Sequence, residues 1–119
     1  MFDDTKPIFL QLAERIADDI LQGTYAEGAQ VPSTNEFAAF YRINPATAGK
    51  GVNLLVDQEI LFKKRGIGMF VSDGAKAKIA AERQSGFVAD FVRPLLAEAA
   101  ALQLSLPQTL SLIEQEATR

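Results

Sequence analysis

The sequence predicts an α+β protein, in which an N-terminal winged helix-turn-helix of three helices and a β-hairpin wing precedes a short appendage of two helices. Two helix-start signals, at Ser33 and Asn44, leave room between them for only one short helix and a tight turn. A basic segment with two glycines, residues 60–71, follows with the pattern of a hairpin. From Lys76 onward the sequence is rich in alanine and returns to helical spacing. We expect the two domains to be residues 1–73 and 74–119.

Length and composition favour one domain with a core, or a small domain with an appendage. The chain has 119 residues, of which 48% are hydrophobic and 23% charged, as in ordinary globular proteins. No apolar run approaches the roughly 20 residues that span a bilayer, and Asp3 and Asp4 near the start do not fit a signal peptide. The chain has no Cys and no His, which excludes disulfides, thiol nucleophiles and the usual zinc sites. We expect a cytoplasmic protein without a metal or a cofactor.

Charge is distributed unevenly along the chain. The net charge is −3, which taken alone disfavours a nucleic-acid partner. Residues 42–65 nevertheless contain five basic residues against two acidic ones, a local charge of +3. Because phosphate binding depends on a local surface patch, the distribution outweighs the total.

The N-terminal part predicts one amphipathic helix, from Pro7 to about Gln22. Its apolar residues recur at helical spacing along one side, at Phe9, Leu12, Ala13, Ile16, Ala17 and Ile20. Gly23 is the expected left-handed stop. The segment from Gln30 to Pro32 is either a short edge strand or an irregular loop, since proline cannot donate to a ladder.

The next helix, the first of the helix-turn-helix, should run from Thr34 to about Tyr41. Ser33 and Glu36 have the spacing of a capping box, in which each side chain satisfies a backbone N–H near the helix start. Helical spacing places Phe37 and Ala38 on the buried side.

The second helix of the motif should run from Pro45 to about Gln58, with Val52, Leu55 and Val56 facing inward. Gly49 and Gly51 weaken such a helix by roughly 1 kcal/mol each relative to alanine. Their presence indicates a close backbone approach, either to a neighbouring helix or to DNA.

The segment behind the helix-turn-helix predicts a β-hairpin, with strands at 60–65 and 69–71 and a tight glycine turn at 66–68. We expect Ile60, Phe62 and Phe70 to face the helices. This leaves Lys63, Arg65 and the tip for solvent or phosphate. Alone, the segment fits a solvated basic hairpin; directly after a helix-turn-helix, it fits a wing.

The C-terminal part predicts a helix from Lys76 to Leu104, which Pro94 should kink or break, and a last helix from Leu106 to Ala117. Roughly 45 residues rarely form a core of their own, so we expect a homodimer through these helices. The alternative is a monomer with the helices folded back. The expected interface residues are the larger apolar ones, Ile79, Phe87, Phe91, Leu95, Leu102, Leu110 and Ile113.

Three stretches in this order and spacing resemble the GntR family of bacterial transcription regulators, and within it the short YtrA-like branch. The stretches are Pro32 to Ala38, Asn44 to Ala48, and Lys64 to Val71, with Gly23 and Gly28 at the family's glycine positions. The resemblance covers Pro7 to Val71 closely and the tail more loosely. It implies a winged helix-turn-helix that binds a palindromic operator as a dimer. The C-terminal helices would form the dimer, and they are also the candidate region for sensing an unidentified small-molecule effector. The kinship also implies a link to transporter operons.

One departure concerns Asn35, because the family commonly has arginine at this position, where it contacts phosphate or base. Asn35 keeps hydrogen-bonding ability but lacks the charge. We therefore expect DNA contacts to depend more on Thr47, Lys50 and the wing. The full set of candidate DNA-binding residues is Ser33, Thr34, Asn35, Asn44, Ala46, Thr47, Lys50, Lys63, Lys64, Arg65, Gly66 and Gly68.

These observations predict a sequence-specific DNA-binding regulator, more specifically a dimeric repressor, that places the helix at 45–58 in the major groove. The wing at 60–71 would contact the DNA backbone or the minor groove. The alternative is an adaptor that uses the winged helix to bind a protein. An enzyme is not expected, because the chain offers neither clustered carboxylates nor a phosphate-binding glycine loop.

Overall fold

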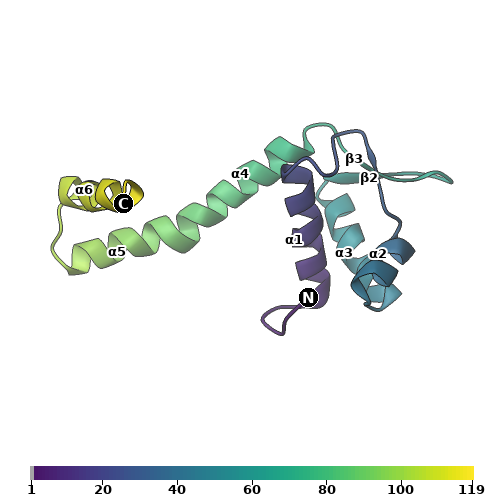
Figure 1. The fold of residues 1–119 in the computed structure, drawn as a ribbon, viewed down its shortest axis with the longest axis horizontal. Helices are drawn as coiled ribbons and strands as arrows, with labels where there is room; N and C mark the ends of the chain where they lie inside the picture. The colour runs from purple at the N-terminus through teal and green to yellow at the C-terminus, as the bar shows by residue number, and fades with distance from the viewer. Residues whose placement is uncertain (1) are drawn as a thin grey trace. The chain divides into compact units, whose positions relative to one another are not determined.

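The computed structural model describes residues 2–119 (Figure 1). The chain divides into two compact units, one ending at Ala81 and the other comprising Glu82–Arg119. The first unit contains α1 (Ile8–Leu21), β1 (Gln30–Val31), α2 (Thr34–Tyr41), α3 (Pro45–Asp57), β2 (Leu61–Lys64), β3 (Gly68–Val71) and the start of α4 (Ala75–Phe87). A π-helical segment (Val88–Val92), α5 (Arg93–Ala101) and α6 (Leu106–Ala117) follow. The predicted winged helix-turn-helix is confirmed.

The core of the first unit forms where α1 packs against α3. The predicted apolar stripe of α1 is buried except at Phe9, which is half-buried. Gly51 of α3 lies so close to α1 that a Cβ atom there would be 2.8 Å from the Phe9 carbonyl oxygen and 3.2 Å from Leu12 Cδ2. The glycine at 51 is therefore required by the neighbouring helix. At Gly49 a Cβ would be 3.6 Å from Thr34 Cγ2, an ordinary contact with α2.

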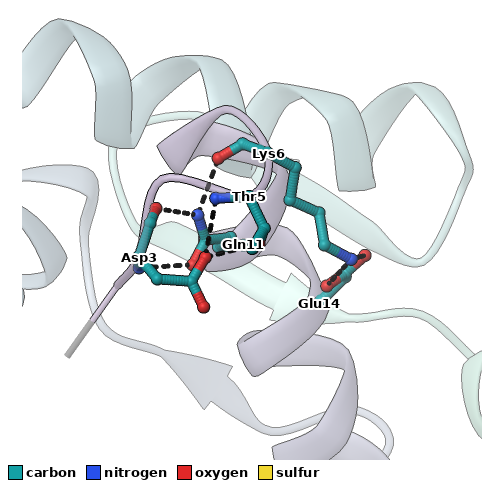
Figure 2. Close-up of polar contacts among 5 residues, drawn as sticks. All are labelled: Asp3, Thr5, Lys6, Gln11 and Glu14. Atoms are coloured by element: carbon teal, nitrogen blue, oxygen red, sulfur yellow. Dashed lines mark hydrogen bonds and ion pairs between the residues drawn. The ribbon is translucent and has the colours of Figure 1, made fainter.

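The segment before α1 folds back onto that helix (Figure 2). The Gln11 side chain donates to the carbonyl oxygens of Asp3 (2.8 Å) and Lys6 (2.7 Å) and accepts from the Asp3 N–H (3.1 Å). Lys6 pairs with Glu14 at 2.7 Å. The returning segment brings the Phe2 ring to 5.4 Å from that of Tyr41 in α2, measured between centroids. The N-terminus thereby covers part of the core.

The three strands form one antiparallel sheet in the order β1-β3-β2. The segment at Gln30 is thus an edge strand, paired with β3, and not an irregular loop. In the hairpin, Leu61 pairs with Val71, and both are buried against the helices.

The expectation that Phe62 and Phe70 face the helices is wrong. These two residues pair across the strands on the opposite face of the hairpin, where their rings stack with centroids 5.8 Å apart. Neighbouring residues of a strand point to opposite faces, so the burial of Leu61 and Val71 turns both rings outward. Ile60, which precedes β2, is buried as expected.

The start of α4 belongs to the first unit. Ala75 and Ile79 are 0% and 3% exposed and pack in its core. The division after Ala81 therefore lies about two helical turns beyond the expected boundary at residue 73. It also removes Ile79 from the expected dimer interface, since that side chain is already covered within its own chain.

In the second unit, Pro94 does not end the helix. The π-helical segment precedes it, and the Arg93 N–H donates to the Val88 carbonyl, so the wider turn accommodates the proline at the start of α5. Ser105 and Gln108 form the expected capping box of α6. Within residues 2–119, every helix is too short or too polar to span a bilayer.

Candidate nucleic-acid interface

The N-terminus of α2 is held by the predicted capping box. Ser33 Oγ accepts from the Glu36 N–H at 3.1 Å, and Glu36 Oε1 accepts from the Ser33 N–H at 2.9 Å. The hydrogen bond from the Ser33 backbone lowers the pKa of Glu36. Ser33 and Asn35 are exposed, whereas Thr34 is half-buried and lies beside α3.

The turn between α2 and α3 is short because Arg42 adopts a left-handed conformation, with φ of 56°. The Ile43 N–H then donates back to the Ala38 carbonyl at 3.0 Å, which closes α2. Asn44 begins α3, and its Oδ1 accepts from the Ala46 N–H at 2.8 Å. This cap leaves the amide NH₂ group of Asn44 as a donor for a phosphate oxygen.

One stripe of α3 faces away from the core. Its exposed residues, at helical spacing, are Ala46, Lys50, Asn53 and Asp57. Thr47, a predicted contact residue, is half-buried beside this stripe. Asn53 was not among the predicted contacts, although its position three residues after Lys50 places it on the same face. An exposed asparagine here can form the paired hydrogen bonds that recognise adenine.

Lys50 lies over the ring of Phe9, with Nζ 4.4 Å from the ring centroid. This cation–π contact holds the side chain along α1 while the residue remains exposed. A contact of this kind at an exposed site contributes about 0.5–1 kcal/mol, so a phosphate can compete for the same ammonium group.

The wing tip is a tight turn that extends away from the helices (Figure 1). The Ile67 N–H donates to the Lys64 carbonyl at 2.9 Å, and Gly66 has φ of 77°, a conformation that favours glycine. Among the described residues 2–119, no atom other than those of the chain neighbours lies within 4 Å of a Cβ placed at Gly66. The tip at Arg65 and Gly66 is therefore open to a close partner.

The three basic residues of the wing differ in their surroundings. Lys63 pairs with Met69 and lies on the same face as the buried Leu61. Lys64 lies on the opposite face, with Nζ 4.4 Å from the centroid of the Phe70 ring. Arg65 is exposed at the turn.

Gly68, also a predicted contact, has a neighbour that the sequence did not suggest. A Cβ atom at this position would occupy the place of the Gln30 side-chain amide. That amide donates to the Ile67 carbonyl at 3.1 Å.

Taken together, the predicted contact residues lie in two groups, one at the N-terminal parts of α2 and α3 and one on the wing.

This geometry defines a winged helix-turn-helix with a basic wing. The chain belongs to the gntR family of bacterial regulatory proteins, whose family model matches residues 9–71. The resemblance seen in the sequence is confirmed.

Relatives in Bacillus subtilis share this region. YurK, an uncharacterized HTH-type transcriptional regulator, is 35% identical over 65 residues, which are 55% of this chain and 27% of YurK. YhcF, another such regulator, is 30% identical over 93 residues, or 73% of this chain and 77% of YhcF. The HTH-type transcriptional repressor YtrA is 30% identical over 73 residues, or 61% of this chain and 56% of YtrA. The chain thus spans about a quarter of YurK but most of YhcF.

The solved structures that are similar to this chain include a GntR-family regulator and an operator-bound DNA-binding domain. A GntR-family transcriptional regulator from Bacteroides thetaiotaomicron is 35% identical with a TM-score of 0.80, covering 94% of this chain and 97% of that one. The DNA-binding domain of AraR, solved in complex with an operator, is 27% identical with a TM-score of 0.57, covering 60% of this chain and 93% of that one. These relatives are regulators, in agreement with the expectation that the chain is not an enzyme.

Proposed function

We propose that the chain is a sequence-specific DNA-binding transcription regulator that represses its target genes as a homodimer. The observation that carries this proposal is the pairing of a capped α3, with one exposed stripe, and a basic wing in the same unit. The operator complex of the similar AraR domain supports it. A partner of this kind places the protein in the cytoplasm, with the chromosome.

The N-terminal end of α3 would enter the major groove. Ala46, Thr47 and Lys50 would meet base edges there, and a threonine methyl or an alanine suits the methyl group of thymine. Ser33, Thr34, Asn35 and Asn44 would bind phosphates through their side chains and the free N–H groups of the helix starts. Their positions at two adjacent helix N-termini favour this division of roles.

The wing would contact the DNA backbone through Lys63, Lys64 and Arg65. Gly66 leaves the tip free of side-chain bulk, which permits entry into the minor groove. In this proposal Gly68 contributes through the backbone conformation of the tip.

The second unit would dimerise the protein. Among residues 82–119, all of which the structure describes, only Ala99 and Thr109 are buried. Large apolar side chains are instead exposed, at Phe87, Val88, Phe91, Leu95, Leu96, Leu102, Leu106, Leu110, Leu112 and Ile113. Helices with so much exposed apolar surface need a partner. In a symmetric dimer, the C-terminal helices of the two copies of the chain would cover each other's apolar surface.

The same helices are a candidate site for an unidentified small-molecule effector. Phe87 and Phe91 are in contact, with ring centroids 5.7 Å apart, and Leu95 follows one turn later. In a dimer these residues would form either interface core or the wall of a small apolar pocket. The proposed target, a transporter operon, rests on kinship with the YtrA-like branch.

A binding assay with the upstream region of the protein's own operon tests the proposal. We expect saturable binding that weakens steeply with salt, because phosphate contacts release counterions. Competition by unrelated DNA of equal length should require a large excess. Binding without sequence preference, or no binding at low salt, contradicts the proposal.

A second candidate function is a protein-binding adaptor that uses the winged helix without DNA. The absence of a cation at Asn35 and the net charge of −3 favour it. Affinity purification that yields a stoichiometric protein partner and retains no DNA would support the adaptor over the regulator.

A further inference from the structure

We infer that Gln30 is a positioning residue for DNA binding, which holds the wing tip in place from the neighbouring strand. This inference rests on the proposed function. It assigns a role to β1, which lies outside the helix-turn-helix and outside the hairpin itself.

The register of the sheet brings Gln30 to the tip. Gln30 pairs with Phe70 of β3, and Gly68 lies two residues further toward the turn on the same face. The Gln30 side chain runs along this face, and its Nε2 donates to the Ile67 carbonyl at 3.1 Å. One hydrogen bond thus connects β1 to the residue next to the turn glycine.

Gly68 makes this path available. Its φ of 148° favours glycine, and any Cβ would collide with the Gln30 amide. At Gly66, by contrast, the space for a side chain is empty. The two glycines of the wing therefore have separate uses: Gly66 forms the turn, and Gly68 leaves room for the amide.

The same face of the hairpin carries the remaining contacts that stiffen the wing. The rings of Phe62 and Phe70 stack there, and Lys64 lies over Phe70. Gln30 extends this layer from the base of the wing to the turn. Without it, the tip that carries Arg65 would be held by the hairpin ladder, the turn hydrogen bond between Lys64 and Ile67 and this aromatic layer, with no hydrogen bond from β1.

The test replaces Gln30 by methionine, which keeps the length of the side chain but cannot donate a hydrogen bond. We expect operator affinity to fall by about three- to tenfold, because a loss of this size corresponds to the usual net free-energy contribution of one intramolecular hydrogen bond. Arg65→Ala should weaken binding as well, and the double variant should bind no more than about twofold worse than Arg65→Ala, since Gln30 acts by placing Arg65. Gln22→Met, an exposed glutamine at the end of α1, is the matched control and should bind as the unaltered protein does.

A second readout uses the protein without DNA. In Gln30→Met, the backbone amides of residues 65–68 should gain fast motion in NMR relaxation, with the amides of α3 unchanged. Gln30→Met that binds as tightly as the unaltered protein, additive losses in the double variant, or an equally rigid tip would each overturn the inference. If the unaltered protein does not bind its operator at all, the proposed function itself fails and this role of Gln30 with it.

Discussion

Glu27 Oε1 accepts a hydrogen bond from the backbone N–H of Gly74 at 2.8 Å. Its second oxygen accepts from the Lys76 N–H at 3.2 Å. These two donors lie at the start of α4, where backbone N–H groups have no partner within the helix. A carboxylate from the loop before β1 thus caps the helix that leads out of the winged unit.

The cap makes the stability of the winged unit depend on pH. The hydrogen bonds from Gly74 and Lys76 lower the pKa of Glu27 in the folded state. The carboxylate therefore contributes its full stabilisation above the usual glutamate pKa of about 4.3, and loses it as pH falls through the lowered value.

We expect Glu27→Gln to be less stable than the unaltered protein at neutral pH, with the difference shrinking below about pH 4. Denaturant unfolding at several pH values measures this. Glu82→Gln, at an exposed position of α4, is the matched control and should leave stability at neutral pH unchanged. A difference that persists undiminished in acid would show that the charge of Glu27 is not the cause.

The two glycines of α3 should respond differently to alanine. Gly51→Ala places a methyl group 2.8 Å from the Phe9 carbonyl oxygen, so we expect a loss of about 1–3 kcal/mol in unfolding free energy. Gly49→Ala makes only an ordinary contact with Thr34 and should gain up to about 1 kcal/mol from helix propensity. Thermal and denaturant unfolding of both variants provide the measurement. Equal effects would contradict the assignment of Gly51 to helix packing.

The boundary after Ala81 predicts which truncation folds. A chain ending at Ala81 keeps Ala75 and Ile79 in the core and should unfold cooperatively as a monomer, whereas one ending at Asp73 loses both. Ile79→Ala in the full chain should cost about 2–5 kcal/mol of unfolding free energy, and Phe91→Ala much less, because Phe91 is 64% exposed.

Sedimentation measurements of self-association then distinguish a residue of the core, Ile79, from a residue of the proposed dimer interface, Phe91. Phe91→Ala should weaken self-association, while Ile79→Ala should affect stability without a matching loss of dimer in the folded fraction. A full-length protein that remains monomeric at high concentration would refute the proposed role of the second unit.

What the sequence predicted well were features encoded within a few residues. The capping boxes at Ser33 and Ser105 and the cap at Asn44 depend on spacings of two or three positions, and all three form as expected. The faces of the hairpin were harder, because both strands carry apolar residues on both sides, as Leu61 and Phe62 do. Only the packing of the core decides which of the two is buried.

Sequence patterns did not predict the contacts between residues that lie far apart in the chain. Glu27 and Gln30 are ordinary polar residues in a loop and an edge strand, yet each bonds a backbone group more than thirty residues away. Ile79 has the same helical spacing as the exposed apolar residues after it. Its burial follows from where α4 begins on the first unit, which spacing alone does not encode.

The salt dependence of binding should identify the cations that meet phosphate. Replacing Lys50 or Arg65 by alanine should weaken operator binding and reduce the slope of log affinity against log salt by about one each. Lys6→Ala is the matched control, because Lys6 pairs with Glu14 on α1. If Lys50→Ala leaves the salt slope unchanged, the ammonium group of Lys50 in the unaltered protein remains over Phe9 in the complex and does not meet phosphate.

Asn35 offers a prediction in the opposite direction. The side chain is exposed in the first turn of α2, near the N-cap residue Ser33, and makes no hydrogen bond among the described residues 2–119. An arginine there adds a cation at the position where the resemblance places a DNA contact, and costs little in helix propensity. We expect Asn35→Arg to bind operator more tightly and to steepen the salt slope by about one.

Ala39→Arg, one turn further along α2 and also exposed, is the control for added charge alone. Equal gains from both variants would mean that Asn35 lies near the DNA without contacting it, because a general field acts on both positions, whereas a contact acts on one.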